Sequence, residues 1–562
     1  MDAPCHTERD GRNKEGEHDP QSGHDAPQLT DAAVDGKVAR PEYACAMRGA
    51  VGAGHPLTAE AGAEVLAEGG NAVDACIAAA FVSWVAESPL TGPGAGGFML
   101  VHQASDRSTR VLDHFVTVPG LGLRSPGVAE MEHAQVDFTA ESSQSFRIGA
   151  GSCAVPGSAV GLGEAHRRFG SLPWPVLLEP AIRHARKGVV ITKAQDYLHA
   201  ILDPILRHTD EGRKIYGPRG RRLRAGDKLV MTDFARTLER LAEKGAGDLY
   251  DGELARTVSA FVREQGGEIT LRDLREYRVI QRRPARAAFL GHELEANPPP
   301  STGGLLIGFG TRLVDRLGAG GPAGSAEAIA RLAEIMREQD AARGEISARD
   351  LSRGGLARRL YDAKALGAAV RRLRARPPES VQGTTHISAV DGQGNAAALT
   401  ASTGAGSGLI VPGTGIQMNN MLGEFDLATT GVHPRSGTRF TSGMAPSLVL
   451  RDGRPRLVVG SAGSLRLRGA IMQVIVNVVA HDMGVKEAID RPRIHLEDST
   501  LNTEGGNDPA ELRRLEAWGY DLHRWRARNL FFGGVSGVEI RTDDTLAAAG
   551  DPRRGGHGVV VG

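Results

Sequence analysis

One threonine, Thr384, stands at the entrance of a strand-like run, where its hydroxyl could act as a nucleophile. A lone threonine before a strand is usually only a good β-former. However, the run at 384–390 is followed by the loop-type sequence DGQGN and then by a second strand-like run, AAALTAS, which predicts a hairpin. If residues 391–395 form the loop, Thr384 opposes Ser402 on the same face. Two hydroxyls then meet at the strand entrance, unless the register slips by one residue.

A second candidate is the glycine-containing turn at residues 460–465, which precedes a helix-like run at 466–480. The N–H groups at a helix N-terminus suit an anion, or the oxyanion of a tetrahedral intermediate. Taken alone, this segment is an ordinary turn, and so is the segment at 442–446. A third glycine-rich segment, residues 92–97, formally contains GxGxxG. Because a helix precedes it and a strand follows it, the order required for a dinucleotide-binding loop is missing.

The elements that must position these residues change in character along the chain. Residues 1–40 lack apolar periodicity and are predicted to be a disordered tail. Residues 59–86 read as helix, glycine stop and helix, and further helical stretches lie near 158–187, 230–266 and 339–376. After Pro377-Pro378 the sequence is strand-like, with two hairpin signals. A mostly helical first part of about 380 residues therefore precedes a strand-rich remainder.

Composition excludes several classes of function. The 562 residues carry 67 Lys+Arg and 67 Asp+Glu, so nothing indicates binding to nucleic acid or to an anionic membrane. The four cysteines form no CxxC pair, which favours neither a disulfide scaffold nor a zinc site. The polar N-terminus is not a secretory signal, and no apolar run could span a bilayer, so the predicted location is the cytoplasm.

Taken together, the segments resemble the γ-glutamyltransferase (γ-glutamyltranspeptidase) family of N-terminal-nucleophile hydrolases. The resemblance runs from about residue 45 to the C-terminus. Its elements, in order, are residues 54–56 (GHP), 69–75 (GGNAVDA), 298–304 (PPPSTGG), 384–388 (TTHIS), 415–420 (GIQMNN), 442–446 (SGMAP) and 460–463 (GSAG). The fold that this resemblance implies is α+β, an αββα four-layer sandwich built by two fragments of one autocleaved precursor.

The resemblance also implies a mechanism. The precursor cuts itself between Gly383 and Thr384, which leaves a large fragment (41–383, after the tail) and a small fragment (384–562) that remain together as a heterodimer. The freed α-amine of Thr384, with an ordinary pKa of about 7.7 to 8.0, can take the proton of its own hydroxyl. Ser402 matches the supporting hydroxyl residue, which agrees with the hairpin pairing. Gly463 and Ser464 match the pair whose N–H groups form the oxyanion hole.

Departures from the family pattern concern the substrate. Members that bind γ-glutamyl groups clamp the α-carboxylate with an arginine, and Phe115 stands at that position here. A bidentate guanidinium contact is one that an aromatic ring cannot replace. Gly404 replaces a substrate-contacting asparagine. In the remaining substrate-binding set, Glu424 replaces an aspartate, Gly443 replaces the second serine of a pair, and Asn420 and Ser442 are retained.

Three functions remain open at this stage. The first is a self-processing hydrolase with an acyl-enzyme on Thr384, acting on a non-standard substrate; family members recruited to actinobacterial secondary metabolism look like hydrolases of a C–C bond. The second is a conventional γ-glutamyltransferase or glutathione hydrolase with a rebuilt carboxylate site that uses His114 or a nearby arginine. The third is an uncleaved, non-catalytic homologue. The expected partners are a small-molecule substrate and a water or amine acceptor. No metal and no organic cofactor is expected.

Overall fold

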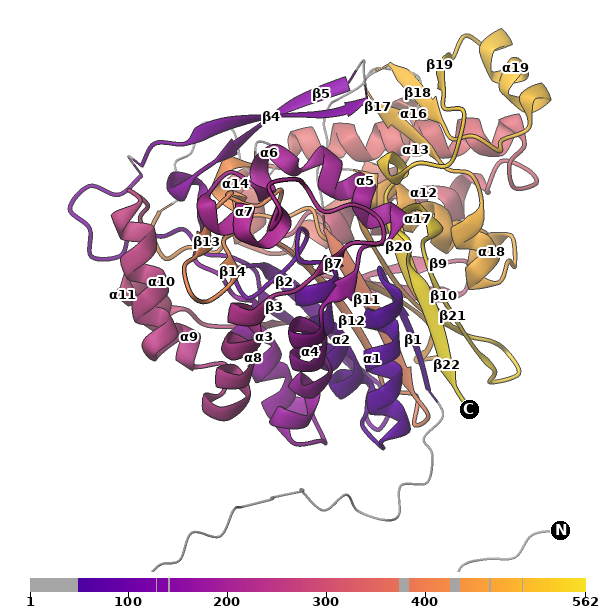
Figure 1. The fold of residues 1–562 in the computed structure, drawn as a ribbon. Helices are drawn as coiled ribbons and strands as arrows, with labels where there is room; N and C mark the ends of the chain where they lie inside the picture. Colours follow the sequence, from indigo (N-terminus) through magenta and orange to yellow (C-terminus); the bar gives the residue numbers. More distant parts are fainter. Residues whose placement is uncertain are drawn as a thin grey trace, which may run out of the picture. The chain divides into compact units, whose positions relative to one another are not determined.

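Two antiparallel β-sheets lie face to face between two layers of helices in this computed structural model (Figure 1). The structure describes residues 49–127, 129–139, 142–372, 384–424, 435–463, 466–497 and 499–562. The predicted tail at 1–40 lies outside these residues. The described residues belong to one unit, Ala44–Gly562.

The first sheet has seven strands in the order β22-β1-β11-β12-β2-β3-β8. Their bounds are β1 (Gly49–Ala53), β2 (Gly96–Gln103), β3 (Ser108–His114), β8 (Ile280–Arg282), β11 (Thr385–Asp391), β12 (Ala396–Ser402) and β22 (His557–Val561). The second sheet has six strands in the order β21-β20-β16-β15-β10-β9. Their bounds are β9 (Ala285–Phe289), β10 (His292–Ala296), β15 (Ser447–Arg451), β16 (Arg454–Ala462), β20 (Gly534–Ile540) and β21 (Leu546–Gly550).

Helices of the first layer cover the outer face of the first sheet, where α1 and α2 pack on β1, β11 and β12. The helices before residue 280 are α1 (Pro56–Ala67), α2 (Ala72–Ala86), α3 (Ser158–Phe169), α4 (Trp174–Lys187), α5 (Lys193–Ile201), α6 (Asp203–Leu206), α7 (Asp210–Tyr216), α8 (Thr232–Lys244), α9 (Asp248–Asp251), α10 (Glu253–Glu264) and α11 (Leu271–Glu276).

Helices of the second layer cover the second sheet, where α12 packs on β9 and α17 packs on β16. The later helices are α12 (Gly303–Leu317), α13 (Ala326–Glu345), α14 (Ala348–Arg353), α15 (Leu356–Leu360), α16 (Ala363–Arg372), α17 (Arg466–Ala480), α18 (Val485–Asp490) and α19 (Pro509–Ala517). Short two- and three-stranded sheets complete the fold, formed by β4 (Glu132–Thr139), β5 (Ser142–Ile148), β6 (Val189–Val190), β7 (Lys228–Leu229), β13 (Ile410–Val411), β14 (Ile416–Gln417), β17 (Ile494–Glu497), β18 (Thr500–Thr503) and β19 (Asp521–Arg524).

Three hydrophobic cores follow from this layering. One lies between the first helix layer and the first sheet and contains Ile387 and Leu399. A second, with Phe98 and Val458, lies between the two sheets. The third lies between the second sheet and α12, α13 and α17. Alternate residues of β11 therefore face different cores, as the period of two in a strand requires.

The predicted hairpin is confirmed. β11 pairs with β12 so that Val390 lies opposite Ala396 and Thr385 lies opposite Ala401. The loop closes with a hydrogen bond from the Asp391 N–H to the Asn395 carbonyl at 3.1 Å. The second predicted hairpin is β15–β16. The rejection of a dinucleotide-binding loop is also confirmed, because α2 precedes the glycines of 92–97 and β2 follows them.

The division into a helical first part and a strand-rich remainder is only half right. The first sheet takes β1, β2, β3 and β8 from before residue 384 and β11, β12 and β22 from after it. Strand β1 lies between β22 and β11 and pairs with both. Sequence periodicity finds single strands, but it cannot show that strands from both halves of the chain alternate in one sheet.

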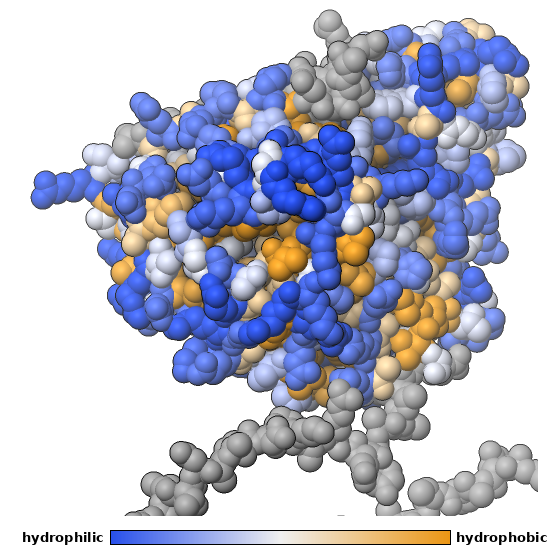
Figure 2. All heavy atoms as spheres, viewed as in Figure 1, coloured by the Kyte–Doolittle hydropathy of each residue, from blue (hydrophilic) through white to orange (hydrophobic). Residues whose placement is uncertain are grey.

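Hydrophilic side chains dominate the face seen in Figure 2, where they separate smaller hydrophobic patches. Exposed large apolar residues are scattered over several elements and include Val190, Val230, Trp518 and Val560. Among the described helices, none is both long enough and apolar enough to cross a membrane.

Candidate active site

Thr384 lies immediately before β11, and its residue is 4% exposed. If the β11–β12 register is continued by one residue, Thr384 stands opposite Ser402. Because side chains alternate along a strand, both residues share the face of His386 and Thr400, which looks toward the second sheet. The Ser402 hydroxyl accepts a hydrogen bond from the Gly404 N–H at 2.7 Å. The structure thus brings the two predicted hydroxyl residues to one edge of the space between the sheets.

The next residue, Thr385, faces the helix layer and meets a buried carboxylate. Its hydroxyl donates a hydrogen bond to Glu87 at 2.6 Å, and the Thr58 hydroxyl donates to the other Glu87 oxygen at 2.8 Å. Burial raises the pKa of Glu87, which the two hydroxyls and the charge of Arg554 oppose. A side chain on Gly54 would come within 2.4 Å of the carboxylate, so the glycine of the GHP motif makes room for it. Sequence reasoning missed Glu87, although a carboxylate that closes the apolar run of α2 is a signal.

His386, the histidine of the TTH motif, is a structural residue. Its two ring nitrogens lie 2.7 Å from the Thr400 hydroxyl and 2.9 Å from the Ser388 hydroxyl. Burial lowers its pKa to about 3, so the ring is neutral at pH 7. Its edge lies against Gly460 of β16, where an added Cβ would come within 2.3 Å of the ring. His386 therefore connects the first sheet to the second.

The glycine turn follows β16, as expected. Gly463 is buried and has φ +124°, a conformation that favours glycine. Helix α17 begins three residues later, at Arg466. Ser464, the other predicted oxyanion residue, lies outside the described residues, and so does Gly383 of the predicted cleavage site. Both assignments stay predictions.

Asn420 and Glu424 close over Gly404. Asn420 Oδ1 accepts a hydrogen bond from the Gly406 N–H at 3.2 Å, and Glu424 Oε1 accepts one from the Ala405 N–H at 3.2 Å. A Cβ at Gly404, which has φ +71°, would lie 2.2 Å from the Asn420 oxygen and 2.6 Å from the Glu424 oxygen. The space of the family's asparagine is thus filled by the neighbouring polar side chains.

Ser442 and Gly443 are held by the PPPSTGG segment. The Ser442 carbonyl accepts hydrogen bonds from the Thr302 N–H at 2.9 Å and from the Ser301 hydroxyl at 3.1 Å. The Ser442 hydroxyl accepts from the Met444 N–H at 3.1 Å. By contrast, a Cβ at Gly443 would meet nothing within 4 Å. This open position is where the family has its second serine.

Phe115 does not point toward these residues. Its ring is fully buried between the sheets and is stacked on Phe98 with centroids 5.5 Å apart. Its carbonyl accepts a hydrogen bond from the Tyr277 hydroxyl at 2.6 Å. A contact between Phe115 and the substrate stays a prediction, because the described contacts of the ring are with core residues.

The two groups expected to rebuild a carboxylate clamp near Phe115 are both held in the interior: neither His114 ring nitrogen has a hydrogen-bond partner among the described residues, whereas Arg439 has several. His114 is buried against α3, and burial lowers its pKa to about 3. Arg439, the nearby arginine, pairs with Asp113 at 3.3 Å and donates to the Phe115 carbonyl and the Tyr277 hydroxyl. Neither side chain is poised to bind a substrate.

An arginine that sequence reasoning missed reaches the nucleophile from the C-terminal end of the chain. Arg554 Nη1 lies 3.3 Å from the Thr384 carbonyl oxygen, to which it donates a hydrogen bond. Its Nη2 lies 3.9 Å from the place of a Cβ on Gly463. The side chain crosses Gly534, where a Cβ would come within 2.4 Å of the arginine Cδ. Nothing in the sequence around residue 554 signals this placement, since it depends on the path of the whole chain.

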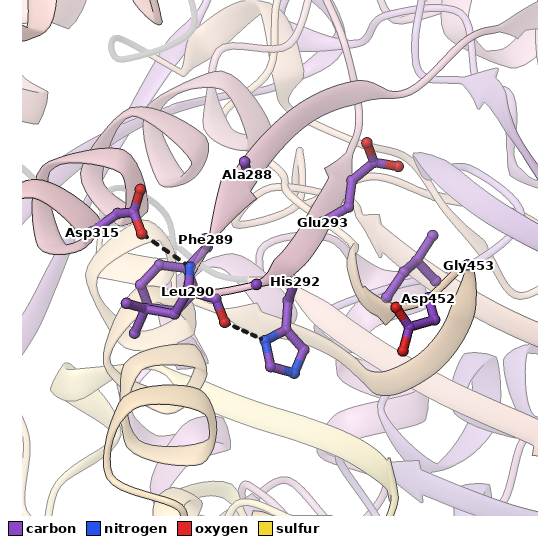
Figure 3. Close-up of a pocket in the computed structure, with 10 residues that line it drawn as sticks. Ala288, Phe289, Leu290, His292, Glu293, Asp315, Asp452 and Gly453 are labelled. Carbon is purple, nitrogen blue, oxygen red and sulfur yellow. Dashed lines mark hydrogen bonds between the residues drawn. The ribbon is translucent and has the colours of Figure 1, made fainter.

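Other cavities hold no comparable chemistry. The cavity of about 360 Å³ in Figure 3 lies at the β9–β10 turn and shares no residue with the candidate site. Its His292 ring is bound to the Leu290 carbonyl at 3.0 Å, which closes the turn. Within the described residues no group of three or more His, Cys, Asp or Glu side chains could hold a metal ion. Cys76 and Cys153 are buried and unpaired by disulfides.

Comparison with known proteins gives consistent matches along the chain. Residues 58–561 match the family model described as Gamma-glutamyltranspeptidase. The chain is 32% identical over 540 residues to an acylase ACY 1 proenzyme of Pseudomonas sp. (strain SE83), covering 92% of this chain and 94% of the relative. It is 32% identical over 547 residues to a glutathione hydrolase proenzyme of Pseudomonas aeruginosa, with 91% and 94% covered. A cephalosporin acylase structure from Bacillus halodurans superposes with a TM-score of 0.79 at 24% identity, covering 94% of this chain and 99% of that one.

Proposed function

This chain belongs to the γ-glutamyltranspeptidase family of N-terminal-nucleophile enzymes, and from that premise we propose that it is a self-processing hydrolase whose acyl-enzyme forms on Thr384. One observation carries the proposal. Thr384 immediately precedes β11 and stands opposite Ser402 when the β11–β12 register is continued by one residue, on the face that looks toward β16 and its glycine turn. A nucleophile, a supporting hydroxyl and a source of N–H donors therefore lie at one place.

Processing would use the same groups as turnover. The Thr384 hydroxyl attacks the Gly383 carbonyl, the bond to the Thr384 nitrogen breaks, and water hydrolyses the resulting ester. The freed α-amine then serves as the base that takes the hydroxyl proton when a substrate carbonyl is attacked. The leaving group departs with a proton, and water releases the acyl group from Thr384. His386 takes no part as a base, because its two ring nitrogens are held by hydroxyls between the sheets.

We further propose that the substrate is not a standard γ-glutamyl amide. Phe115 lies in the core, and the closure of Asn420 and Glu424 over Gly404 leaves no space for a side chain at that position. The acyl-transfer groups are thus retained while the amino-acid clamp is lost. A family member recruited to secondary metabolism, acting on an amide or on a C–C bond next to a carbonyl, fits this combination.

One observation favours a second candidate function, a conventional glutathione hydrolase. Glu424 keeps a buried carboxylate beside Asn420, where an α-ammonium group could bind, and the Pseudomonas aeruginosa relative is named a glutathione hydrolase. Turnover of a γ-glutamyl anilide, compared with an acyl anilide that lacks the amino group, separates the two candidates. A clear preference for the γ-glutamyl compound would favour the second.

The test of self-processing is a denaturing gel with N-terminal sequencing. We expect the purified chain to give two fragments, the smaller beginning at Thr384, and we expect Thr384→Ala to remain whole. Thr257→Ala, at a half-buried threonine of α10, is the control and should process normally. A wild-type chain that stays intact after prolonged incubation would contradict the proposal.

A further inference from the structure

Arg554 differs from the buried arginines beside it in having no carboxylate partner. Arg493 pairs with Asp551 at 2.7 Å, and Arg553 pairs with Glu504 and Asp551. Among the described residues, no carboxylate oxygen lies within 4.0 Å of the Arg554 guanidinium. Within the described part of the chain, its one hydrogen bond goes to the Thr384 carbonyl, and its buried Nε has no partner there.

The carboxylates near Arg554 are already engaged. Glu87 accepts from Thr58 and Thr385, and Asp551 accepts from the Val535 N–H at 2.8 Å in addition to its arginine pairs. Both carboxylates act on Arg554 through space, and burial lowers its pKa to about 10. The guanidinium is therefore still charged at pH 7, with donors left over.

A second buried guanidinium, that of Arg466, is close enough for the charge of Arg554 to act on it. Arg466, at the start of α17, is 5% exposed, and its Nε and Nη1 are buried without a partner in the described part of the chain. Its guanidinium stacks over the Phe531 ring at 4.1 Å. Burial lowers the pKa of Arg466 to about 9; the charge of Glu497 opposes this shift, and the charge of Arg554 adds to it. Buried N–H donors without a partner cost free energy, and so do two guanidinium charges that act on each other. An anion bound by Arg466 and Arg554 would reduce both costs.

Arg554 lies next to the residue that carries the proposed nucleophile, Thr384. The Arg554 guanidinium spans the Thr384 carbonyl and the Gly463 turn, and Gly534 and Gly463 leave the space that its side chain occupies. Arg554 and Glu87 both line a cavity of about 30 Å³, which has room for roughly one water molecule. An anionic group a few bonds from the carbonyl that Thr384 attacks is therefore within reach of the guanidinium.

We propose that Arg554, supported by Arg466, binds a carboxylate of the substrate and replaces the arginine that the family places at residue 115. The inference rests on the proposed Thr384 hydrolase and names its substrate class: acyl compounds that carry a second, anionic group near the scissile carbonyl. The guanidinium comes from residue 554 and not from residue 115. The carboxylate of the substrate would therefore point in another direction from the α-carboxylate of a γ-glutamyl group.

The test compares two anilides that differ only in charge. Succinyl p-nitroanilide carries a carboxylate, and its primary-amide analogue is isosteric and neutral. We expect processed wild-type enzyme to prefer the carboxylate by at least about tenfold in kcat/KM, the usual scale of a hydrogen bond to a charged group. In Arg554→Gln the ratio should fall to about one, and Arg554→Lys should retain part of it. Because the ratio is measured on one preparation, a general loss of activity does not change it.

The matched control is Arg451→Gln, at an exposed arginine that ends β15, which should keep the wild-type ratio. Equal rates for the two anilides in processed wild type, or an unchanged ratio in Arg554→Gln, would overturn the inference and leave the proposed function intact. A chain that does not process defeats the proposed function instead, as the gel shows directly. If Arg554→Gln does not process, the same ratio of kcat/KM values is compared between wild type and Arg554→Lys. An unchanged ratio in Arg554→Lys would then overturn the inference. If processed wild type turns over neither anilide, calorimetry with succinate decides, and absence of binding overturns the inference.

Discussion

At the scale of single residues, Thr384 has the neighbours that the proposed acyl transfer would use, whereas Phe115, at the proposed clamp position, lies in the core. Thr384 and Ser402 share one face of the hairpin, and Arg554 contacts the Thr384 carbonyl. Phe115 turns its ring into the core. The strand register sets the position of Thr384 opposite Ser402, whereas the side chain at residue 115 alone decides whether the family's carboxylate clamp is present. The proposed chemistry can therefore be kept while the substrate contact changes.

Restoring the family arginine at residue 115 should damage the fold before it can help binding. Phe115→Arg removes a buried ring that stacks on Phe98 and leaves a guanidinium in an apolar core. The expected loss in the free energy of unfolding is about 4 kcal/mol or more, measured by urea denaturation. Val190→Arg, at a residue 57% exposed, should change stability by less than about 0.5 kcal/mol. A Phe115→Arg variant as stable as wild type would show that the ring position is not a closed core.

Residues differ in how far the sequence could predict their place. The opposition of Thr384 and Ser402 followed from counting loop residues, because hairpin register is a local property. Arg554 and Glu87 could not be placed in this way. Arg554 reaches the Thr384 carbonyl from 170 residues away along the chain, and Glu87 reaches the Thr385 hydroxyl from 298 residues away, through contacts that depend on the packing of both sheets.

At the scale of elements, successive side chains of strand β11 point to opposite faces of the first sheet, and each face has its own contacts. Thr385 points to α2 and is held by Glu87, while His386 points to β16 and rests on Gly460. The strand that carries the nucleophile is thus fixed from both faces. The helix and strand types along this region were predictable from periodicity, but the neighbours on each face were not, since they come from other parts of the sheets.

A methyl group at Gly460 should push the two sheets apart at the nucleophile strand. The ideal Cβ would lie 2.3 Å from two atoms of the His386 ring, which its hydrogen bonds to Thr400 and Ser388 hold in place. We expect Gly460→Ala to lower the free energy of unfolding by about 1 to 3 kcal/mol and to slow processing at Thr384. Gly344→Ala in α13, where a Cβ meets nothing within 4 Å, should be neutral or stabilising. If Gly460→Ala changed neither stability nor processing, the contact between His386 and Gly460 would not be one that positions β11.

At the scale of the whole molecule, the interleaved sheets bury many histidines as neutral rings. Each sheet combines strands from both sides of residue 384, and helices pack on both sheets. Burial lowers the pKa of His114 and His386 to about 3 and of His55 and His199 to about 4, and His495 is lowered well below its ordinary value. Three buried carboxylates, Glu87, Glu295 and Glu338, have raised pKa values.

These shifts predict a protein that loses stability in mild acid. A histidine with a lowered folded pKa stabilises the fold above its ordinary pKa of 6.5, and this contribution is lost as the pH falls toward the folded value. A carboxylate whose pKa is raised in the folded state acts in the opposite sense. It contributes to the free energy of unfolding at low pH, and this contribution is lost as the pH rises through the folded-state pKa. The described histidines with a lowered pKa outnumber these carboxylates, so the free energy of unfolding should fall as the pH falls from about 6 to 5, by about 1.4 kcal/mol per pH unit for each net proton taken up on unfolding. Urea midpoints measured from pH 7.5 to 5 should fall accordingly, and His114→Gln should flatten the slope by one proton, whereas Val190→Gln, at an exposed residue that does not titrate, should not. A midpoint that stays constant across this range would mean that the buried rings are already protonated or reach solvent in the folded protein.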